Sequence, residues 1–292
     1  MIRCNCSSKS VCGLRVCLNF SGSKIRKVRI DQLVWIYHKT NYEKQVHIID
    51  DSHWESIKNI LTDKRKRKYC LRTIFNAILW ICRTGSQWRN LSSEYPYWQI
   101  VYYYFDKWKK SGVQEQVMLK LVRKDRIYQG HNYAPSVGAI DSQSVKKSAF
   151  VSIETGIDGG KHINGRKRHL AVDSLGLPIA INVSSANVHD SIGAFDLLWR
   201  IDKVSHRMKL IRTDKAYCGD FSEMVEKYYK WKMEITQKPP SEKGFVPQKG
   251  RWQVERSFAW LNNFRRLSKD YEKLPESAVA FIQVAFISIL LK

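Results

Sequence analysis

The stretch Arg251-Trp-Gln-Val-Glu-Arg-Ser-Phe-Ala-Trp-Leu-Asn-Asn-Phe-Arg-Arg266 combines a helical pattern with a single carboxylate among arginines. At about 100° per residue, Val254, Phe258 and Leu261 form one apolar stripe, which predicts a helix that packs on a core. Glu255 lies at the edge of this stripe, so the helix can bring its carboxylate to a site built by other segments. The other groups of such a site have to come from elsewhere in the chain.

Two aspartates each end a short strand-like run: Asp141 ends the run 137–141, and Asp214 ends the run 208–214. Further strands are predicted at 168–173, 178–184 and 233–236, and helices at 191–201, with Asp190 as N-cap, and at 221–231. Together with the helix at 251–266, this gives three strands, a helix, a strand, a helix, a strand and a helix. That order is typical of a ribonuclease H-like domain, an α/β fold with a mixed sheet and flanking helices. We predict this domain at residues 134–292.

In such a fold the strands that end in Asp141 and Asp214 lie side by side, and Glu255 joins the two aspartates from the last helix. Three converging carboxylates repel one another unless cations neutralise them, and hard oxygen ligands favour Mg²⁺ or Mn²⁺. Two such ions, about 3.5–4 Å apart, can hold both the attacking and the leaving oxygen of a phosphodiester displacement. We therefore predict that Asp141, Asp214 and Glu255 are catalytic residues and ligands of two metal ions.

Each acid also has an ordinary interpretation. Asp141 and Asp214 can cap turns, and Glu255 can form an ion pair with Arg251 one helical turn earlier. The strand order and the net charge together favour the metal site over these three separate explanations.

The charge of the chain indicates its partner. Fifty Lys and Arg residues against 27 Asp and Glu give a net charge of +23, which favours a polyanion such as nucleic acid over a merely solvated basic surface. His169 and His189 are assigned hydrogen-bonding rather than catalytic roles. Basic residues that flank the acids are the candidates for DNA contacts: Lys161, Arg166, Lys167, Arg168, Arg251, Arg256, Arg265 and Arg266.

The sequence that precedes the predicted sheet has the apolar periodicity of α-helices. A capping box at Ser52 and Glu55 starts one helix, and further helices are predicted at 71–84, 98–110 and 113–123. Short helices joined by a tight glycine-containing turn are compatible with helix-turn-helix DNA binding, so residues 46–128 are predicted as an all-α DNA-binding domain. Residues 1–45 have no clear period and are predicted to be a poorly ordered basic arm.

The cysteine count and the apolar segments indicate the compartment. Seven cysteines, an odd number, do not suggest a secreted disulfide framework, and a reducing cytoplasm fits better. Cys4, Cys6, Cys12 and Cys17 cluster but form no clean C-x-x-C pair, so a zinc site there is weakly supported. The apolar stretch 278–291 is shorter than the roughly 17–25 residues of a membrane span. It is predicted to be a closing core helix, with no membrane partner.

Several ordered blocks resemble those of the IS5-family insertion-sequence transposases, within the wider IS4-like DDE group. The blocks are Ala139-Ile-Asp-Ser-Gln-Ser-Val-Lys146, Gly165-Arg-Lys-Arg-His169 with Val172-Asp-Ser-Leu-Gly176, Thr213-Asp-Lys-Ala-Tyr217, and Arg251 to Leu261. In the helical part, Asn76-Ala-Ile-Leu, Arg83-Thr-Gly-Ser-Gln-Trp88 and Tyr97-Trp-Gln-Ile-Val-Tyr102 extend the likeness. The resemblance covers roughly residues 48 to 290.

This resemblance implies a bacterial, cytoplasmic, nucleoid-associated transposase that binds the inverted-repeat ends of its own element, cuts there and joins the ends to target DNA. It also implies a homo-oligomer on DNA, and it places the family's catalytic triad on Asp141, Asp214 and Glu255. The related group often has a tyrosine three residues before the arginine of the last motif and a lysine seven residues after the glutamate. Here Gln248 and Asn262 occupy these positions. The alternatives are a nuclease without strand transfer and a degenerate remnant that only binds DNA.

Overall fold

The structure, a computed structural model, describes residues 49–61, 66–236 and 251–291, all within one compact unit. The predicted arm at residues 1–45, with its four clustered cysteines, and Gln248 lie outside the described residues. Cys70, Cys82 and Cys218, which are described, are free thiols.

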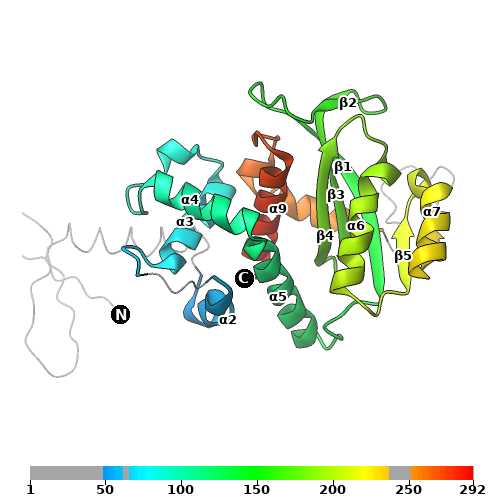
Figure 1. The fold of residues 1–292 in the computed structure, drawn as a ribbon, viewed down its shortest axis with the longest axis horizontal. Helices are drawn as coiled ribbons and strands as arrows, with labels where there is room; N and C mark the ends of the chain where they lie inside the picture. The colour runs from blue at the N-terminus through cyan, green and yellow to red at the C-terminus, as the bar shows by residue number, and fades with distance from the viewer. Residues whose placement is uncertain (1–48, 62–65, 237–250, 292) are drawn as a thin grey trace, which may run out of the picture. The chain divides into compact units, whose positions relative to one another are not determined.

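An all-α region precedes the sheet (Figure 1). It comprises α2 (Asp51–Leu61), α3 (Leu71–Thr84), the 3-10 turn η1 (Trp88–Asn90), α4 (Trp98–Lys110) and α5 (Val113–Tyr128). The helices predicted at 71–84 and 98–110 are confirmed, and α5 continues past the predicted end at residue 123. Gly112 makes the tight turn between α4 and α5 with φ of 68°, a backbone conformation that glycine adopts without strain.

The start of α2 differs from the prediction. The Asp50 carboxylate accepts a hydrogen bond from the backbone N–H of His53 at 2.7 Å and another from the Ser52 hydroxyl at 3.0 Å. Asp50 is therefore the N-cap, because its side chain satisfies a backbone donor of the first turn. The predicted capping box of Ser52 and Glu55 is wrong, and the Glu55 carboxylate instead pairs with Lys58.

The sheet is mixed and has six strands among the described residues. They are β1 (Val137–Lys146), β2 (Gly156–Asp158), β3 (Ile163–Asp173), β4 (Pro178–Ser185), β5 (Leu210–Thr213) and β6 (Lys232–Ile235). The order is β2-β3-β1-β5-β6, and β4 also pairs with β3. β3 is antiparallel to β1, β2 and β4, whereas β5 is parallel to β1 and β6. Every predicted strand is present, β1 is longer than predicted, and the three-residue β2 was not predicted.

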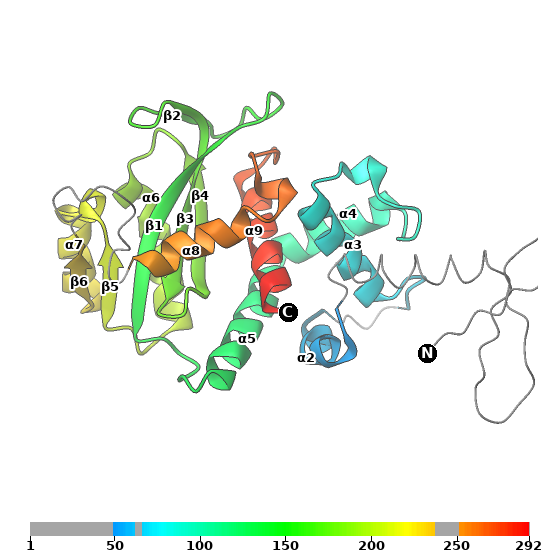
Figure 2. The same ribbon diagram turned by 180° about the vertical axis from the view of Figure 1, so that it is seen from behind.

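Helices α6 (Asp190–Val204) and α8 (Trp252–Leu261) cover opposite faces of the sheet, as Figures 1 and 2 show. Alternation of side chains along the strands accounts for this arrangement. On β1, Ala139 belongs to the hydrophobic cluster that contains Val254 of α8, while the next residue, Ile140, belongs to the cluster that contains Leu197 of α6. The predicted α/β fold, a ribonuclease H-like mixed sheet with flanking helices, is confirmed.

Three helix boundaries depart from the predictions. The helix predicted at 221–231 is a short α7 (Asp220–Met224) followed by a π-helical turn, η3 (Val225–Tyr229). The pattern at 251–266 ends as an α-helix at Leu261 and is followed by the 3-10 turn η4 (Arg265–Leu267). Asp190 is the first residue of α6 rather than its cap, and its carboxylate pairs with Lys167 at 2.9 Å.

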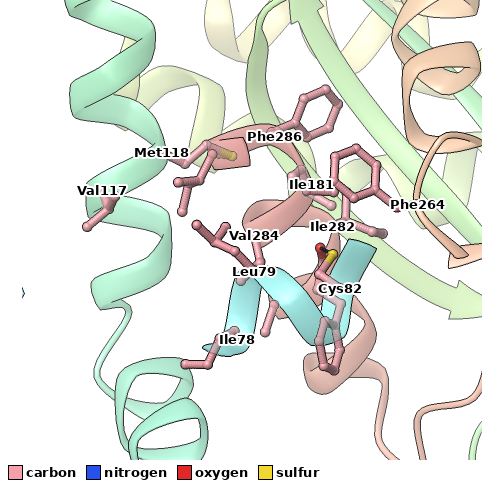
Figure 3. Packing of buried hydrophobic residues seen from close by; sticks show 14 of the residues in the cluster. Ile78, Leu79, Cys82, Val117, Met118, Ile181, Phe264, Ile282, Val284 and Phe286 are labelled. Carbon is pink, nitrogen blue, oxygen red and sulfur yellow. Dashed lines mark hydrogen bonds between the residues drawn. The ribbon is translucent and has the colours of Figure 1, made fainter. Parts of the chain in front are cut away.

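The last helix, α9 (Pro275–Leu290), is the centre of the larger hydrophobic cluster. It is buried on nearly every side, as a helix that is apolar all round should be. Figure 3 shows Ile282 and Val284 of α9 near Leu79 of α3, Met118 of α5 and Ile181 of β4. The helical region and the sheet thus share one core through α9, which confirms the predicted closing core helix. Among the described residues, no helix is long and apolar enough to cross a membrane.

Candidate functional site

The parallel pairing of β1 with β5 brings Asp141, within β1, and Asp214, directly after β5, to the same level of two neighbouring strands. The last paired residues of the two strands are Ala139 and Arg212. Each aspartate stands two residues beyond its member of this pair, so the two carboxylates leave the strands at the same level. The prediction that these two strands lie side by side is confirmed.

Strand alternation also sets the direction of Asp141. It is two residues from Ala139 and directly opposite Leu170 of β3, and both of these belong to the hydrophobic cluster on the α8 side. Asp141 therefore points toward α8, the helix that carries Glu255. The fold brings all three predicted acids to one side of the sheet, and Glu255 is partly exposed there.

Each aspartate uses one oxygen for a backbone amide and the other for the site. Asp141 accepts from the amide of Ser142 at 2.8 Å, and Asp214 accepts from the amide of Ala216 at 2.9 Å. The bond of Asp214 is the capping interaction that the sequence left open, at the start of the 3-10 turn η2 (Lys215–Tyr217), whereas Asp141 lies within β1 and caps no turn. Both bonds involve Oδ1 only, so the Oδ2 atoms of both residues remain available for a shared partner.

That partner in this structure is Arg251. Its Nη2 lies 3.0 Å from Asp141 Oδ2 and 3.8 Å from Asp214 Oδ2. The alternative interpretation, an ion pair between Arg251 and Glu255, is not what the described residues form. The guanidinium instead places one positive charge beside the carboxylates of Asp141 and Asp214.

The electrostatics of the site follow from burial and from these charges. Burial raises the pKa of Asp141 above its usual value, the Arg251 guanidinium counteracts this, and the nearby Asp214 carboxylate adds to the rise. Burial alone would lower the pKa of Arg251, but Asp141, Asp214 and Glu255 together hold it above its ordinary value. All three acids therefore act on the same cationic group.

The donor set fits a hard divalent cation, although the described residues contain no preformed cluster of three or more His, Cys, Asp or Glu side chains. The argument for the fit is chemical: two carboxylate oxygens converge on one positive group, and a buried carboxylate such as Asp141 needs a cation to stay ionised. Asp141 and Asp214 would hold the ion, with Glu255 on the adjacent helix as the third ligand.

A buried polar group missed by the sequence analysis lies behind the aspartates. Tyr217 is fully buried just after Asp214, and burial, followed by the charges of Asp141, Asp190 and Asp214, raises the pKa of its hydroxyl. An aromatic residue three positions after the acid, in Thr213-Asp-Lys-Ala-Tyr217, was the available signal. Tyr217 belongs to the hydrophobic cluster on the α6 side of the sheet, so its neutral phenol adds no charge near the acids.

The predicted basic patch on β3 is not a surface. Arg166 is 0% exposed and its guanidinium bonds to Asp270 at 3.0 Å and to surrounding backbone carbonyls. Arg168 donates to the Leu267 carbonyl at 2.9 Å, and burial lowers its pKa to about 10. Lys167, on the opposite face of the strand, pairs with Asp190. Because both faces of β3 are covered, these three residues cannot reach a polyanion, which corrects the prediction made for them.

The remaining predicted DNA contacts differ in exposure. Lys161 and Arg265 are exposed. Arg256 is partly exposed, stacks over the rings of Trp252 and Trp260 at 4.4 and 4.7 Å, and donates to the Leu175 carbonyl at 2.6 Å.

Arg266 has a structural role in this chain. Its side chain is 10% exposed and pairs with Glu272 at 2.7 Å. Arg251 is likewise held by the acids of the site. These two arginines are thus engaged by the protein itself, unlike Lys161 and Arg265.

Both histidines form the hydrogen bonds that were predicted for them. His169 is fully buried and its Nε2 lies 2.8 Å from the Ser184 hydroxyl, while His189 Nδ1 lies 2.8 Å from the Ser191 hydroxyl. Burial lowers the pKa of His169 to about 4. A histidine held neutral on the far side of the sheet from α8 has no contact with the acids that would suit a catalytic role.

Comparisons with known proteins agree with the geometry. The family model described as a transposase DDE domain matches residues 132–291, and that of a putative transposase of the IS4/5 family matches residues 49–118. A curated protein from Burkholderia cepacia, a putative transposase for insertion sequence element IS402, is 30% identical over 127 residues, which cover 41% of this chain and 60% of the relative. The chain thus spans about 60% of the length of that relative.

Proposed function

The chain belongs to the family of transposases with a DDE domain, and from this premise we propose that it is a metal-dependent DNA transposase. It binds the inverted-repeat ends of its own insertion sequence in the bacterial nucleoid, cuts the DNA there and joins the ends to target DNA. The family implies a DNA substrate and dependence on a divalent metal. The identity of the residues that perform the reaction is our proposal.

The observation that carries the proposal is the convergence of the Oδ2 atoms of Asp141 and Asp214 on one cationic group, 3.0 and 3.8 Å away. Asp141, Asp214 and Glu255 act as the metal ligands. Two Mg²⁺ or Mn²⁺ ions, when bound, supply the charge that activates the attacking oxygen and stabilises the leaving oxygen. The protein residues hold these oxygens in line and need not take up protons themselves.

Arg251 has two roles in this proposal. Its charge keeps the buried carboxylate of Asp141 ionised, because it offsets the effect of burial and of the neighbouring Asp214. Its planar guanidinium, with five N–H donors, also suits a phosphate oxygen, so it can contact the DNA backbone beside the acids.

DNA binding is assigned to the basic surface of both regions. Residues 46–128 form the helical DNA-binding domain, and residues 134–292 form the catalytic domain, where the exposed Lys161 and Arg265 and the half-exposed Arg256 contact phosphates. The net charge of +23 supports a polyanion substrate. Cutting two ends and joining them to one target is most simply achieved by a homo-oligomer on DNA.

The test is a cleavage and joining assay on a plasmid that carries this gene between its native flanks, with Mg²⁺. Asp214→Ala is compared with the wild type, and Asp220→Ala, an exposed acid at the start of α7, is the matched control. We expect cuts at the element ends and joined products with wild type and control, and neither with Asp214→Ala.

Three other outcomes would contradict the proposal. Cuts without joined products would indicate a nuclease, and a specific shift of end DNA without cuts would indicate a protein that only binds. Equal cleavage by Asp214→Ala and the wild type would remove Asp214 from the site.

A further inference from the structure

The position of Glu255 depends on what holds α8 against the sheet. Asp141 and Asp214 are fixed by the strands that carry them, but Glu255 lies on a helix and can shift with it. At its first turn α8 is attached through Arg251, which bonds to Asp141 at 3.0 Å. Val254, Phe258 and Leu261 pack the apolar face of α8 on the core, but apolar contacts are non-directional, so a second polar attachment restricts the rotation of the helix further.

The second attachment is the turn between β3 and β4, residues 174–177. Ser257 is fully buried, and its hydroxyl oxygen lies 2.7 Å from the Gly176 carbonyl oxygen and 2.8 Å from that of Gln253, so its single proton is shared between an acceptor on the turn and one on α8 itself. Arg256 donates to the Leu175 carbonyl at 2.6 Å. The two residues that directly follow Glu255 in sequence therefore bind two successive carbonyls of one turn.

The turn is built to present these carbonyls. The buried side chain of Asp173 accepts from the amides of Leu175 and Leu177 at 2.9 and 2.8 Å, which directs the turn amides inward. Gly176 has φ of 75°. A Cβ at this residue would lie 3.0 Å from Arg256 Nη2 and 3.1 Å from Ser257 Oγ, so a larger residue would crowd the two side chains that bind the turn and strain the backbone as well.

Two tryptophans of α8 orient the Arg256 side chain toward the turn. The Arg256 guanidinium lies over the Trp252 ring at 4.4 Å and over the Trp260 ring at 4.7 Å, one helical turn to either side. Stacking between two indoles restricts its rotamers and favours the bond to the turn. Asp173 in turn is paired with the buried Arg126 of α5, so the turn is itself supported from behind.

We propose that the β3–β4 turn positions the catalytic glutamate: Ser257, Gly176 and Asp173 are positioning residues that fix the rotation of α8 and so place Glu255 beside Asp141 and Asp214. The inference rests on the proposed function, because it assumes that Glu255 is a metal ligand. None of the three positioning residues touches metal or DNA. They act through the helix.

The test uses two variants that disturb the same contact from opposite sides. Ser257→Ala removes the donor on α8, and Gly176→Ala adds a methyl group on the turn. Ser205→Ala is the matched control, because Ser205 is also a fully buried serine whose hydroxyl donates to a backbone carbonyl, that of Pro135, and it does not contact α8.

Two quantities are measured on the full chain: Mn²⁺ affinity without DNA, from the electron paramagnetic resonance signal of free Mn²⁺, and the rate of end cleavage. We expect each variant to weaken Mn²⁺ binding about fivefold, the effect of losing roughly one net hydrogen bond, and to slow cleavage. The thermal midpoint of Ser257→Ala should equal that of Ser205→Ala, whereas Gly176→Ala should melt lower because φ is 75° at that residue. Both variants should bind end DNA as Ser205→Ala does. If Gly176→Ala does not fold, Ser257→Ala decides alone.

The inference is overturned if the variants lose stability while their Mn²⁺ affinity stays at the wild-type value. This result differs from a failure of the proposed function. In that case the wild type itself would neither bind Mn²⁺ nor cleave, and the assumption about Glu255 would be wrong.

Discussion

Nη2 of Arg251 lies 3.0 Å from Oδ2 of Asp141, so the residue that directly precedes α8 is bound to a residue at the centre of β1. Burial raises the pKa of Asp141, and the Arg251 guanidinium opposes that rise. A metal ligand has to be deprotonated, so this contact links the pH dependence of the reaction to one arginine.

Arg251→Gln should therefore move the acidic limb of the cleavage rate to higher pH. Without the guanidinium, only the hydrogen bond from the Ser142 amide still opposes burial and the Asp214 charge, so the pKa of Asp141 rises further. The measurement is the rate of end cleavage between about pH 5 and pH 9. Arg212→Gln, which removes an ion pair with Glu234 one strand away, is the control and should keep the wild-type profile. Identical profiles for Arg251→Gln and the wild type would contradict the assignment.

Asp141→Asn should abolish cleavage without loss of stability in the absence of metal. The folded-state pKa of Asp141 is raised, so its charge is unfavourable in the fold, and the stability that it costs grows as pH rises through that pKa. Thermal melting in EDTA should give a midpoint equal to or above that of the wild type. Added Mn²⁺ should raise the wild-type midpoint and leave that of the variant in place, because only a protein that binds the ion gains from it. Equal metal-induced shifts would exclude Asp141 as a ligand.

The acids could be predicted from sequence because their position depends on regular features. The pairing of β1 with β5 follows from strand order, and the direction of Asp141 follows from alternation with Ala139. Both inferences, the strand pairing and the side-chain direction, require only the local sequence pattern and the expected order of the strands. The contact of Arg251 with Asp141, rather than with Glu255, could not be predicted, because it depends on how α8 crosses β1.

The basic residues of β3 were mispredicted for a related reason. Arg166 and Arg168 resemble a surface patch in sequence, but the segment after α8 covers that face and supplies Asp270 and the Leu267 carbonyl as partners. Such a cover comes from a segment about 100 residues away, as the separations of 104 and 99 residues show. Local charge patterns carry no information on it.

Lys161→Ala and Arg265→Ala should each weaken DNA binding and lower the slope of log affinity against log salt concentration by about 1. Both side chains are exposed and free to contact a phosphate. Lys203→Ala, an exposed lysine at the end of α6 on the opposite face of the sheet from α8, is the control and should leave the slope unchanged. The measurement is fluorescence anisotropy with labelled end DNA at several salt concentrations. A loss of slope for Lys203→Ala equal to that of the other two would argue against the proposed surface.

Arg126→Met should destabilise the fold by about 3–5 kcal/mol, because it leaves the carboxylate of Asp173 buried without its charge partner. Arg200→Met, which breaks a half-exposed pair with Glu115, should cost no more than about 1 kcal/mol. Urea denaturation measures both. The double variant Arg126→Met with Asp173→Asn should recover part of the loss, since no charge is then left unpaired. A similar cost for the two single variants would mean that the Arg126 pair is solvated.

His169 should make the fold sensitive to mild acid. Burial lowers the folded-state pKa of His169 from 6.5 to about 4. Between these two pH values the unfolded chain therefore binds a proton at His169 that the folded chain does not bind. The contribution to stability is complete above about pH 6.5 and is lost as pH falls toward 4, to a total of about 3 kcal/mol. In urea titrations across this range His169→Gln should therefore lose less stability on acidification than the wild type. His206→Gln, at an exposed histidine, should follow the wild-type curve, and a parallel course for all three proteins would show that His169 is protonated without cost in the fold.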